Sequence, residues 1–199
     1  YNGAYYAYAS TAANLAKYVN EAKGDIEVFV TGDIAGDATL QQKPNVGVTI
    51  TGNGKNYNGA IVIDGKTAGY DTASMTIKGL NFSANTLSDD AFINLGKEGN
   101  NNTRYTRNVT VEGCTFSSTG GAIVAVKSYT GGDKYVSIID CTVNEGVHSL
   151  AQLTNVEEGL KFEGCVVAAK NGVNLNNTPT FKMNDCSFDV KGYAIRVGV

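Results

Sequence analysis

The sequence predicts an all-β fold, a parallel β-helix, because one motif recurs along the chain and alternates between apolar and polar residues. The fullest copy is VTVEGCTFSSTGGAIVAV at Val109–Val126. Its first half returns, in order along the chain, at Val48–Gly54 (a shorter copy), Met75–Phe82, Val136–Val143, Leu160–Val167 and Phe181–Phe188. Such alternation is the period of a strand with one buried face. The Gly or Asp after the alternating residues then supplies a bend.

The spacing of the copies indicates a solenoid. Their first strands begin at residues 48, 75, 109, 136, 160 and 181, which gives steps of 27, 34, 27, 24 and 21 residues. A unit of this size cannot bury an apolar face alone, so neighbouring units stack. With no helical pattern between the strands, each copy predicts one rung, and equivalent residues should stack about 4.8 Å apart. A β-sandwich is the competing fold, but it does not require one motif to recur with the same side-chain orientation.

The segment before the repeats predicts a helix and a first rung. Residues 1–9 have no clear period, whereas Ser10 or Thr11 can cap a helix that runs through Lys23 and stops at Gly24. The apolar stripe of this helix should cover the open first rung, Ile26–Val30. We therefore expect a single domain over residues 1–199, with residues 1–25 as an N-terminal cap and residues 26–199 as rungs.

These repeats resemble the right-handed parallel β-helix of the pectate-lyase-like superfamily, and the likeness covers nearly the whole chain. The opening LAKYVNEAKGDIEVFV…VTITGNG is also similar to that superfamily's usual order of helix, Gly-Asp, first rung and Gly-rich bend. The resemblance implies a right-handed β-helix with a helical cap. The superfamily contains lyases, hydrolases, adhesins and structural domains, so the resemblance implies no single activity.

The composition of the chain limits the classes of molecule that it is expected to bind. The net charge is −3 and there is no cationic run, so nothing favours nucleic acid. No apolar run approaches the roughly 18 residues of a membrane span, so we expect no membrane insertion. Because the chain begins at Tyr1 and not at Met, we expect a trimmed or excised domain of an exported bacterial protein, secreted or on the cell surface.

The four cysteines, Cys114, Cys141, Cys165 and Cys186, suggest either disulfides or a zinc site at first sight. All four occupy one position of the repeat, which is Leu80 in an earlier copy. Side chains at one repeat position point the same way in a line and do not converge as a tetrahedron. We therefore predict buried, reduced cysteines and no metal.

Asp89 and Asp90 are the first candidates for catalysis. They resemble the paired-aspartate motif of polygalacturonase-type hydrolases, in which carboxylates act as general acid and base. That resemblance also implies a third Asp, a Gly-His-Gly motif and an Arg-x-Lys motif, which this chain lacks. Its single histidine, His148, lies two rungs away without flanking glycines. Asp is also common at turns, where this pair stands.

A calcium-dependent lyase would need several carboxylates close together. The outward columns of the first strands contain no Asp. With Asp89, Asp90 and His148 as the remaining catalytic candidates, the sequence leans towards a domain that is not an enzyme, with no cofactor.

The loops after the second strands carry the candidate ligand-binding residues. Three long loops on successive rungs, residues 65–74, 96–108 and 128–135, hold Tyr70, Tyr105, Tyr129 and Tyr135 together with Arg104 and Arg107. Aromatic faces among polar donors suit stacking on sugar rings. In the alternative interpretation, the tyrosines pack the loops against the solenoid.

We therefore expect an exported binding or adhesion module whose partner is a polysaccharide or another glycan. The alternatives are a polysaccharide-degrading enzyme of the pectin-lyase-like type and a structural spacer. The final rung, at the sequence RVGV, has no polar cap after it. We expect a partner copy, by self-association through this C-terminal edge, or later sequence to cover it.

Overall fold

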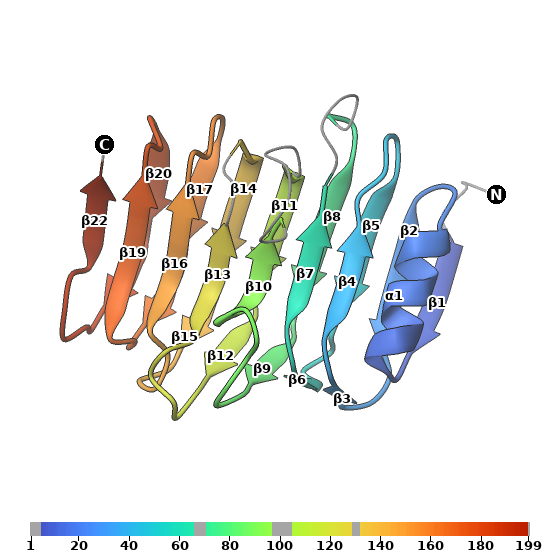
Figure 1. Cartoon of the computed structure of the whole chain (residues 1–199), viewed down its shortest axis with the longest axis horizontal. Coiled ribbons are helices and arrows are strands. Elements are labelled where there is room, and N and C mark those ends of the chain that lie inside the picture. Colours follow the sequence, from blue (N-terminus) through green and yellow to red (C-terminus); the bar gives the residue numbers. More distant parts are fainter. Residues whose placement is uncertain (1–4, 66–70, 97–104, 129–131, 199) are drawn as a thin grey trace.

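The computed structural model describes residues 5–65, 71–96, 105–128 and 132–198, which form an all-β parallel solenoid with one short helix, as predicted (Figure 1). The first sheet contains β1 (Tyr5–Ala9), β2 (Ile26–Val30), β5 (Gly47–Thr51), β8 (Ser74–Lys78), β11 (Arg107–Glu112), β14 (Lys134–Ile139), β17 (Leu160–Glu163) and β20 (Phe181–Asn184). The second contains β3 (Ile34–Ala35), β6 (Asn56–Asn58), β9 (Asn81–Ser83), β12 (Thr115–Ser117), β15 (Thr142–Val143), β18 (Val166–Val167) and β21 (Ser187–Phe188). The third contains β4 (Ala38–Gln41), β7 (Ile61–Asp64), β10 (Ala91–Leu95), β13 (Val124–Ser128), β16 (Ser149–Thr154), β19 (Asn171–Asn176) and β22 (Ile195–Gly198).

Each turn after β1 contributes one strand to every sheet, and the bend in the motif divides the first sheet from the second. The bend residue is Gly79, Gly113, Asp140, Gly164 or Asp185 in successive rungs, with φ values of 65°, 57°, 50°, 62° and 52°. Glycine has no Cβ to strain in this left-handed region, and aspartate tolerates it. The predicted role of the Gly or Asp is thereby confirmed.

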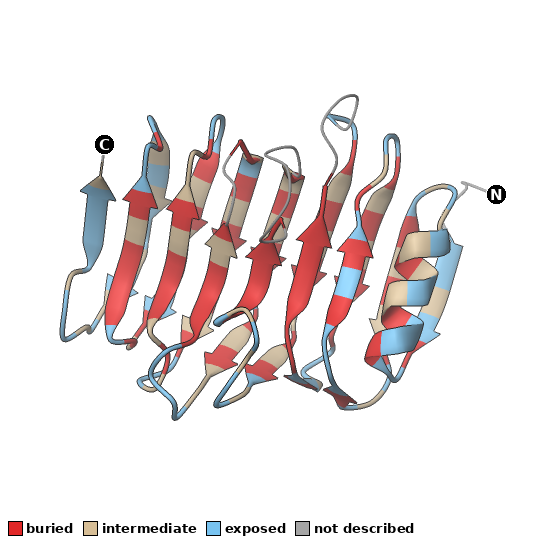
Figure 2. Cartoon of the chain, viewed as in Figure 1, coloured by how far each residue is buried: buried red, intermediate tan, exposed pale blue. Residues whose placement is uncertain are grey.

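The alternating apolar residues of the repeats form the core (Figure 2). The first column pairs in register across the first sheet, and so does the second. They contain Met75, Val109, Val136, Leu160 and Phe181, and Ile77, Val111, Ile138, Phe162 and Met183. All are buried except Phe181 and Met183 in the last rung, which are half-buried because no described rung follows them.

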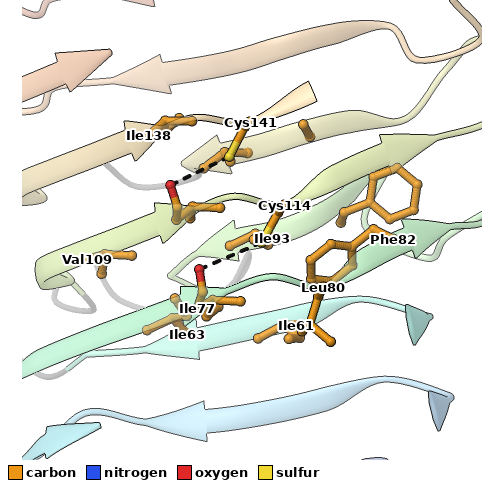
Figure 3. Close-up of a cluster of buried hydrophobic side chains, with 14 of the residues drawn as sticks. Ile61, Ile63, Ile77, Leu80, Phe82, Ile93, Val109, Cys114, Ile138 and Cys141 are labelled. Atoms are coloured by element: carbon orange, nitrogen blue, oxygen red, sulfur yellow. Dashed lines mark hydrogen bonds between the residues drawn. The ribbon is translucent and has the colours of Figure 1, made fainter. Parts of the chain in front are cut away.

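The cysteines line a third inward column, as predicted (Figure 3). Cys114, Cys141 and Cys165 are buried, Cys186 is half-buried in the last rung, and all four are free. The thiols of Cys114 and Cys141 donate to the carbonyl oxygens of Ile77 and Val111, at 3.7 and 3.6 Å. These cysteines therefore act as small core residues with a weak donor.

The helix α1 (Ala12–Glu21) begins where predicted and ends two residues before Lys23. Thr11 is its N-cap, and its hydroxyl oxygen accepts from the Asn14 N–H at 3.1 Å. Ala12, Leu15 and Val19 are buried against the first rung. Among the described residues, no helix is long and apolar enough to cross a membrane.

The strand β1 is an element that sequence analysis missed. It pairs in parallel with β2, from Tyr5 opposite Ile26 to Ala9 opposite Val30. Its tyrosines fall on both faces of the strand, so the segment shows no alternation from which a strand could be predicted.

Candidate ligand-binding groove

Three of the six loop residues predicted to bind a ligand, Tyr70, Arg104 and Tyr129, lie outside the described residues. The structure places Tyr105, Arg107 and Tyr135, which all lie near the start of strands of the first sheet. Ligand binding by the six residues stays a prediction. The surroundings of the three described ones show what each contributes to the fold.

Arg107 is built into the solenoid and is only 7% exposed. Its Nε donates to the Asp71 carboxylate at 3.0 Å, and one terminal nitrogen donates to the carbonyl oxygens of Thr106 and Gly132, at 3.0 and 2.8 Å. Its backbone exchanges two hydrogen bonds with the buried amide of Gln42, at 2.9 and 2.6 Å. The guanidinium group thus holds together segments that are far apart in sequence.

Tyr105 packs beside this arginine, whereas Tyr135 is half open to solvent. The Arg107 guanidinium carbon lies 5.7 Å from the centre of the Tyr105 ring, and a Cβ at Gly132 would come within 2.6 Å of that ring. Tyr135 is 50% exposed and its hydroxyl donates to the Glu158 carboxylate at 2.6 Å. This bond, with the negative charge of Glu158, raises the pKa of Tyr135.

Asp133 is a buried carboxylate that the sequence did not single out. Its Oδ1 accepts from the Thr106 N–H and hydroxyl at 2.7 and 2.8 Å, while its Oδ2 has no hydrogen-bond partner among the described residues. Burial raises the pKa of Asp133 to about 6, although the Thr106 bonds and the charge of Arg107 oppose the shift. In the sequence, Asp133 stands in the segment GGDKY. This segment has the composition of a solvated turn, so the burial of Asp133 could not be predicted.

A catalytic role for Asp89, Asp90 or His148 stays untested, and the structure shows where Asp90 and His148 lie relative to each other. Asp90 takes a turn conformation with φ of 51°. Because Ala91, Val124 and Ser149 align in register, Asp90 and His148 occupy equivalent positions with Ile123 between them. Two strand spacings separate them, about 10 Å. Within the described ranges, no group of three or more His, Cys, Asp or Glu side chains could hold a metal ion.

A groove of about 350 Å³ lies on the third sheet, over its last four strands. It follows a column in which Lys127 aligns with Gln152, Gln152 with Asn174, and Asn174 with Arg196. These strands, β13, β16, β19 and β22, lie side by side in Figure 1. Thr154 and Asn176 add a second polar column. We call this surface the amide strip.

The described residues of the amide strip can form hydrogen bonds, and none of them is a carboxylate. Its described lining contains amides, hydroxyls and the two cations Lys127 and Arg196, but no Asp, Glu or His. Beside the groove, the Gln152 Nε2 lies 3.2 Å from the His148 Nδ1. Burial, and then the charge of Lys170, lower the pKa of His148 and favour the neutral ring that can accept from this amide. The neutral His148 ring can therefore hold the Gln152 amide in place.

The amide strip carried a signal in the sequence. Its residues are the polar members of the second half of the motif, in AVKS, LAQLT, GVNLN and AIRVG. Alternation alone marks them as outward, but the same alternation marks every solvated sheet face.

No protein-family model matches this chain, and no curated protein matches it.

Proposed function

We propose that this chain is an exported, non-catalytic binding domain that holds a glycan along the amide strip. We further propose that its solenoid is a member of the pectate-lyase-like superfamily, on the repeats and the opening segment given above. The observation that carries the function is the column Lys127, Gln152, Asn174 and Arg196, open along a groove of about 350 Å³.

The donor set of the strip suits sugar hydroxyls. An amide can donate and accept at once, as a hydroxyl can, so a row of amides can follow hydroxyls along a chain of sugars. Strands about 4.8 Å apart repeat these groups at regular intervals. Each hydrogen bond is worth about 1 kcal/mol net, so one domain binds weakly and many copies are needed for firm attachment.

The composition of the groove favours binding over hydrolysis. Glycoside hydrolysis needs two carboxyl groups on either side of the scissile bond. The described lining of the strip contains none, and Asp90 and His148 are separated by Ile123. A polysaccharide-degrading enzyme remains the second candidate function. Its only support is the resemblance to the pectate-lyase-like superfamily.

The test is retention on a panel of neutral and acidic polysaccharides, measured by affinity gel electrophoresis. Gln152→Ala combined with Asn174→Ala should weaken retention tenfold or more, because about two hydrogen bonds are lost. The matched control is Thr110→Ala combined with Ser137→Ala, an aligned polar pair on the first sheet. It should leave retention unchanged.

Three results would contradict the proposal. If no polysaccharide retains the unmodified domain, it is a spacer. If the control pair weakens retention as much as the strip pair does, the ligand lies elsewhere. Release of shorter oligosaccharides during incubation would make the domain an enzyme.

A further inference from the structure

Strand β1 lies at one edge of the first sheet. Among the described residues, β1 pairs with β2 alone. The Tyr5 N–H donates to the Asp25 carbonyl oxygen at 3.0 Å, and the Ala9 carbonyl oxygen accepts from the Thr31 N–H at 2.9 Å. Along a strand, the N–H and C=O groups of successive residues point alternately to its two sides. Those of Tyr5 and Ala9 point to β2, so those of Tyr6 and Tyr8 point away from it. Such an edge is a template for another strand.

Exposed tyrosines gather along the same edge. Tyr5, Tyr6 and Tyr8 are 63%, 65% and 64% exposed. The rings of Tyr6 and Tyr8 both stack on Phe29, with centroids 6.1 and 5.8 Å apart. A pocket of about 640 Å³ follows the strand as far as Tyr18 and the residues at the end of α1. Contiguous apolar surface of this kind marks interaction sites more often than scattered single residues do.

We propose that a second copy of this chain occupies this edge, with β1 pairing antiparallel to its own counterpart about a twofold axis at Ala7. In this register, Tyr6 lies opposite the partner's Tyr8, and Tyr8 opposite the partner's Tyr6. Each of these pairs exchanges two backbone hydrogen bonds, because both residues already direct their N–H and C=O groups to the free edge. The two first sheets then continue as one.

The side chains agree with this register. Cross-strand aromatic pairs stabilise an antiparallel ladder, and the twofold axis brings the two Tyr6–Tyr8–Phe29 clusters together on one face. Ala7 meets the partner's Ala7 as a pair without hydrogen bonds, where the Cα atoms approach to about 4.5 Å. A methyl group is small enough for that approach.

The head-to-head arrangement is also favoured over a head-to-tail one. Figure 1 shows α1 across the same end of the solenoid as β1. The exposed side of α1 carries Lys17 and Glu21, so two facing copies can bring opposite charges together. A head-to-tail stack would instead place this polar side on Ile195 and Val197, which are exposed in the last strand.

Directed disulfide formation tests the register. Ala7→Cys, incubated with oxidised glutathione, should give a covalent dimer on a non-reducing gel, because the paired Cα atoms fall within the 4.4–6.8 Å that a disulfide spans. Tyr6→Cys is the matched control. It should not cross-link to itself, because it faces the partner's Tyr8, but it should cross-link when mixed with Tyr8→Cys.

Light scattering tests the assembly without cysteines. The unmodified protein should have twice the monomer mass, and Tyr6→Lys combined with Tyr8→Lys should have the monomer mass, with a far-ultraviolet circular dichroism spectrum unchanged. Monomer mass for the unmodified protein at roughly 100 μM, or equal self-linking of Tyr6→Cys and Ala7→Cys, would overturn the proposal. So would a monomer in which the double lysine variant loses polysaccharide retention, since the tyrosines would then be a sugar platform. The mass and cross-linking results do not depend on the amide strip.

Discussion

At the scale of single residues, Asp133 opposes folding at neutral pH. Its carboxylate is fully buried, and its Oδ2 has no hydrogen-bond partner among the described residues. Removing a charge from water without full compensation favours the protonated form, which is the main reason for its raised pKa of about 6. Thr106 and Arg107 reduce this penalty but do not remove it.

We therefore predict that the free energy of unfolding increases on acidification from pH 7 to pH 4, as far as this group is concerned. Its folded pKa of about 6 exceeds its ordinary value of 3.8. The folded state thus binds the proton more tightly, and stability is lost as pH rises through this window. This difference of about two pKa units corresponds to about 3 kcal/mol in the free energy of unfolding. Urea titrations at several pH values in this range give the free energy of unfolding of the unmodified protein and of Asp133→Asn. Only the unmodified protein should show this pH-dependent change. Equal pH dependence in the two proteins would contradict the prediction.

At the scale of elements, α1 closes the open first rung. The Asn20 amide donates to the Thr39 carbonyl oxygen at 2.9 Å, and its oxygen accepts from the Gln41 N–H at 2.8 Å. The edge of β4 is thus covered by a side chain where another rung would otherwise pair. Leu15 and Val19 complete the cap by filling the end of the core.

The cap predicts a clear contrast between two faces of one helix. Leu15→Ala should lower the free energy of unfolding by about 2–5 kcal/mol, because it leaves a cavity beneath the helix. Lys17→Ala, on the exposed side, should change it by no more than about 0.5 kcal/mol. Equal effects in urea denaturation would mean that α1 does not seal the core.

At the scale of the whole molecule, the solenoid should be strongest in its middle. Each rung contacts only its neighbours, so an end rung has one supporting interface instead of two. Ile138 is buried between rungs, whereas Met183 in the same column is half-buried at the end. Ile195 and Val197 of the last strand are exposed, and self-association through this C-terminal edge stays a prediction, separate from the pairing proposed for β1.

Substitutions along this one column test the gradient. Ile138→Ala should destabilise the protein by about 2–5 kcal/mol, and Met183→Ala by clearly less, because its side chain already contacts water. Hydrogen exchange should show the last rung opening before the central ones. A larger effect at residue 183 than at residue 138 would contradict the assignment of the ends.

The sequence by itself determined the solenoid, its register and the inward position of the cysteines. Those features repeat every 21 to 34 residues, and a local alternation with a Gly or Asp bend is enough to say which side chains face inward. Cys141 and the apolar positions of each rung could therefore be placed in the core without coordinates.

Only the tertiary structure decided which outward residues matter. The Gln42 amide bonds to the backbone of Arg107 although 65 residues separate them, and Asp133 bonds to the neighbouring Thr106. No local pattern predicts these contacts. Alternation marks Gln152 and Asn174 as outward in the same way as any solvated residue. That they face a groove, and that β1 has no second strand partner among the described residues, follows from how the rungs stack. Both depend on neighbours distant in sequence, and local periodicity carries no information about them.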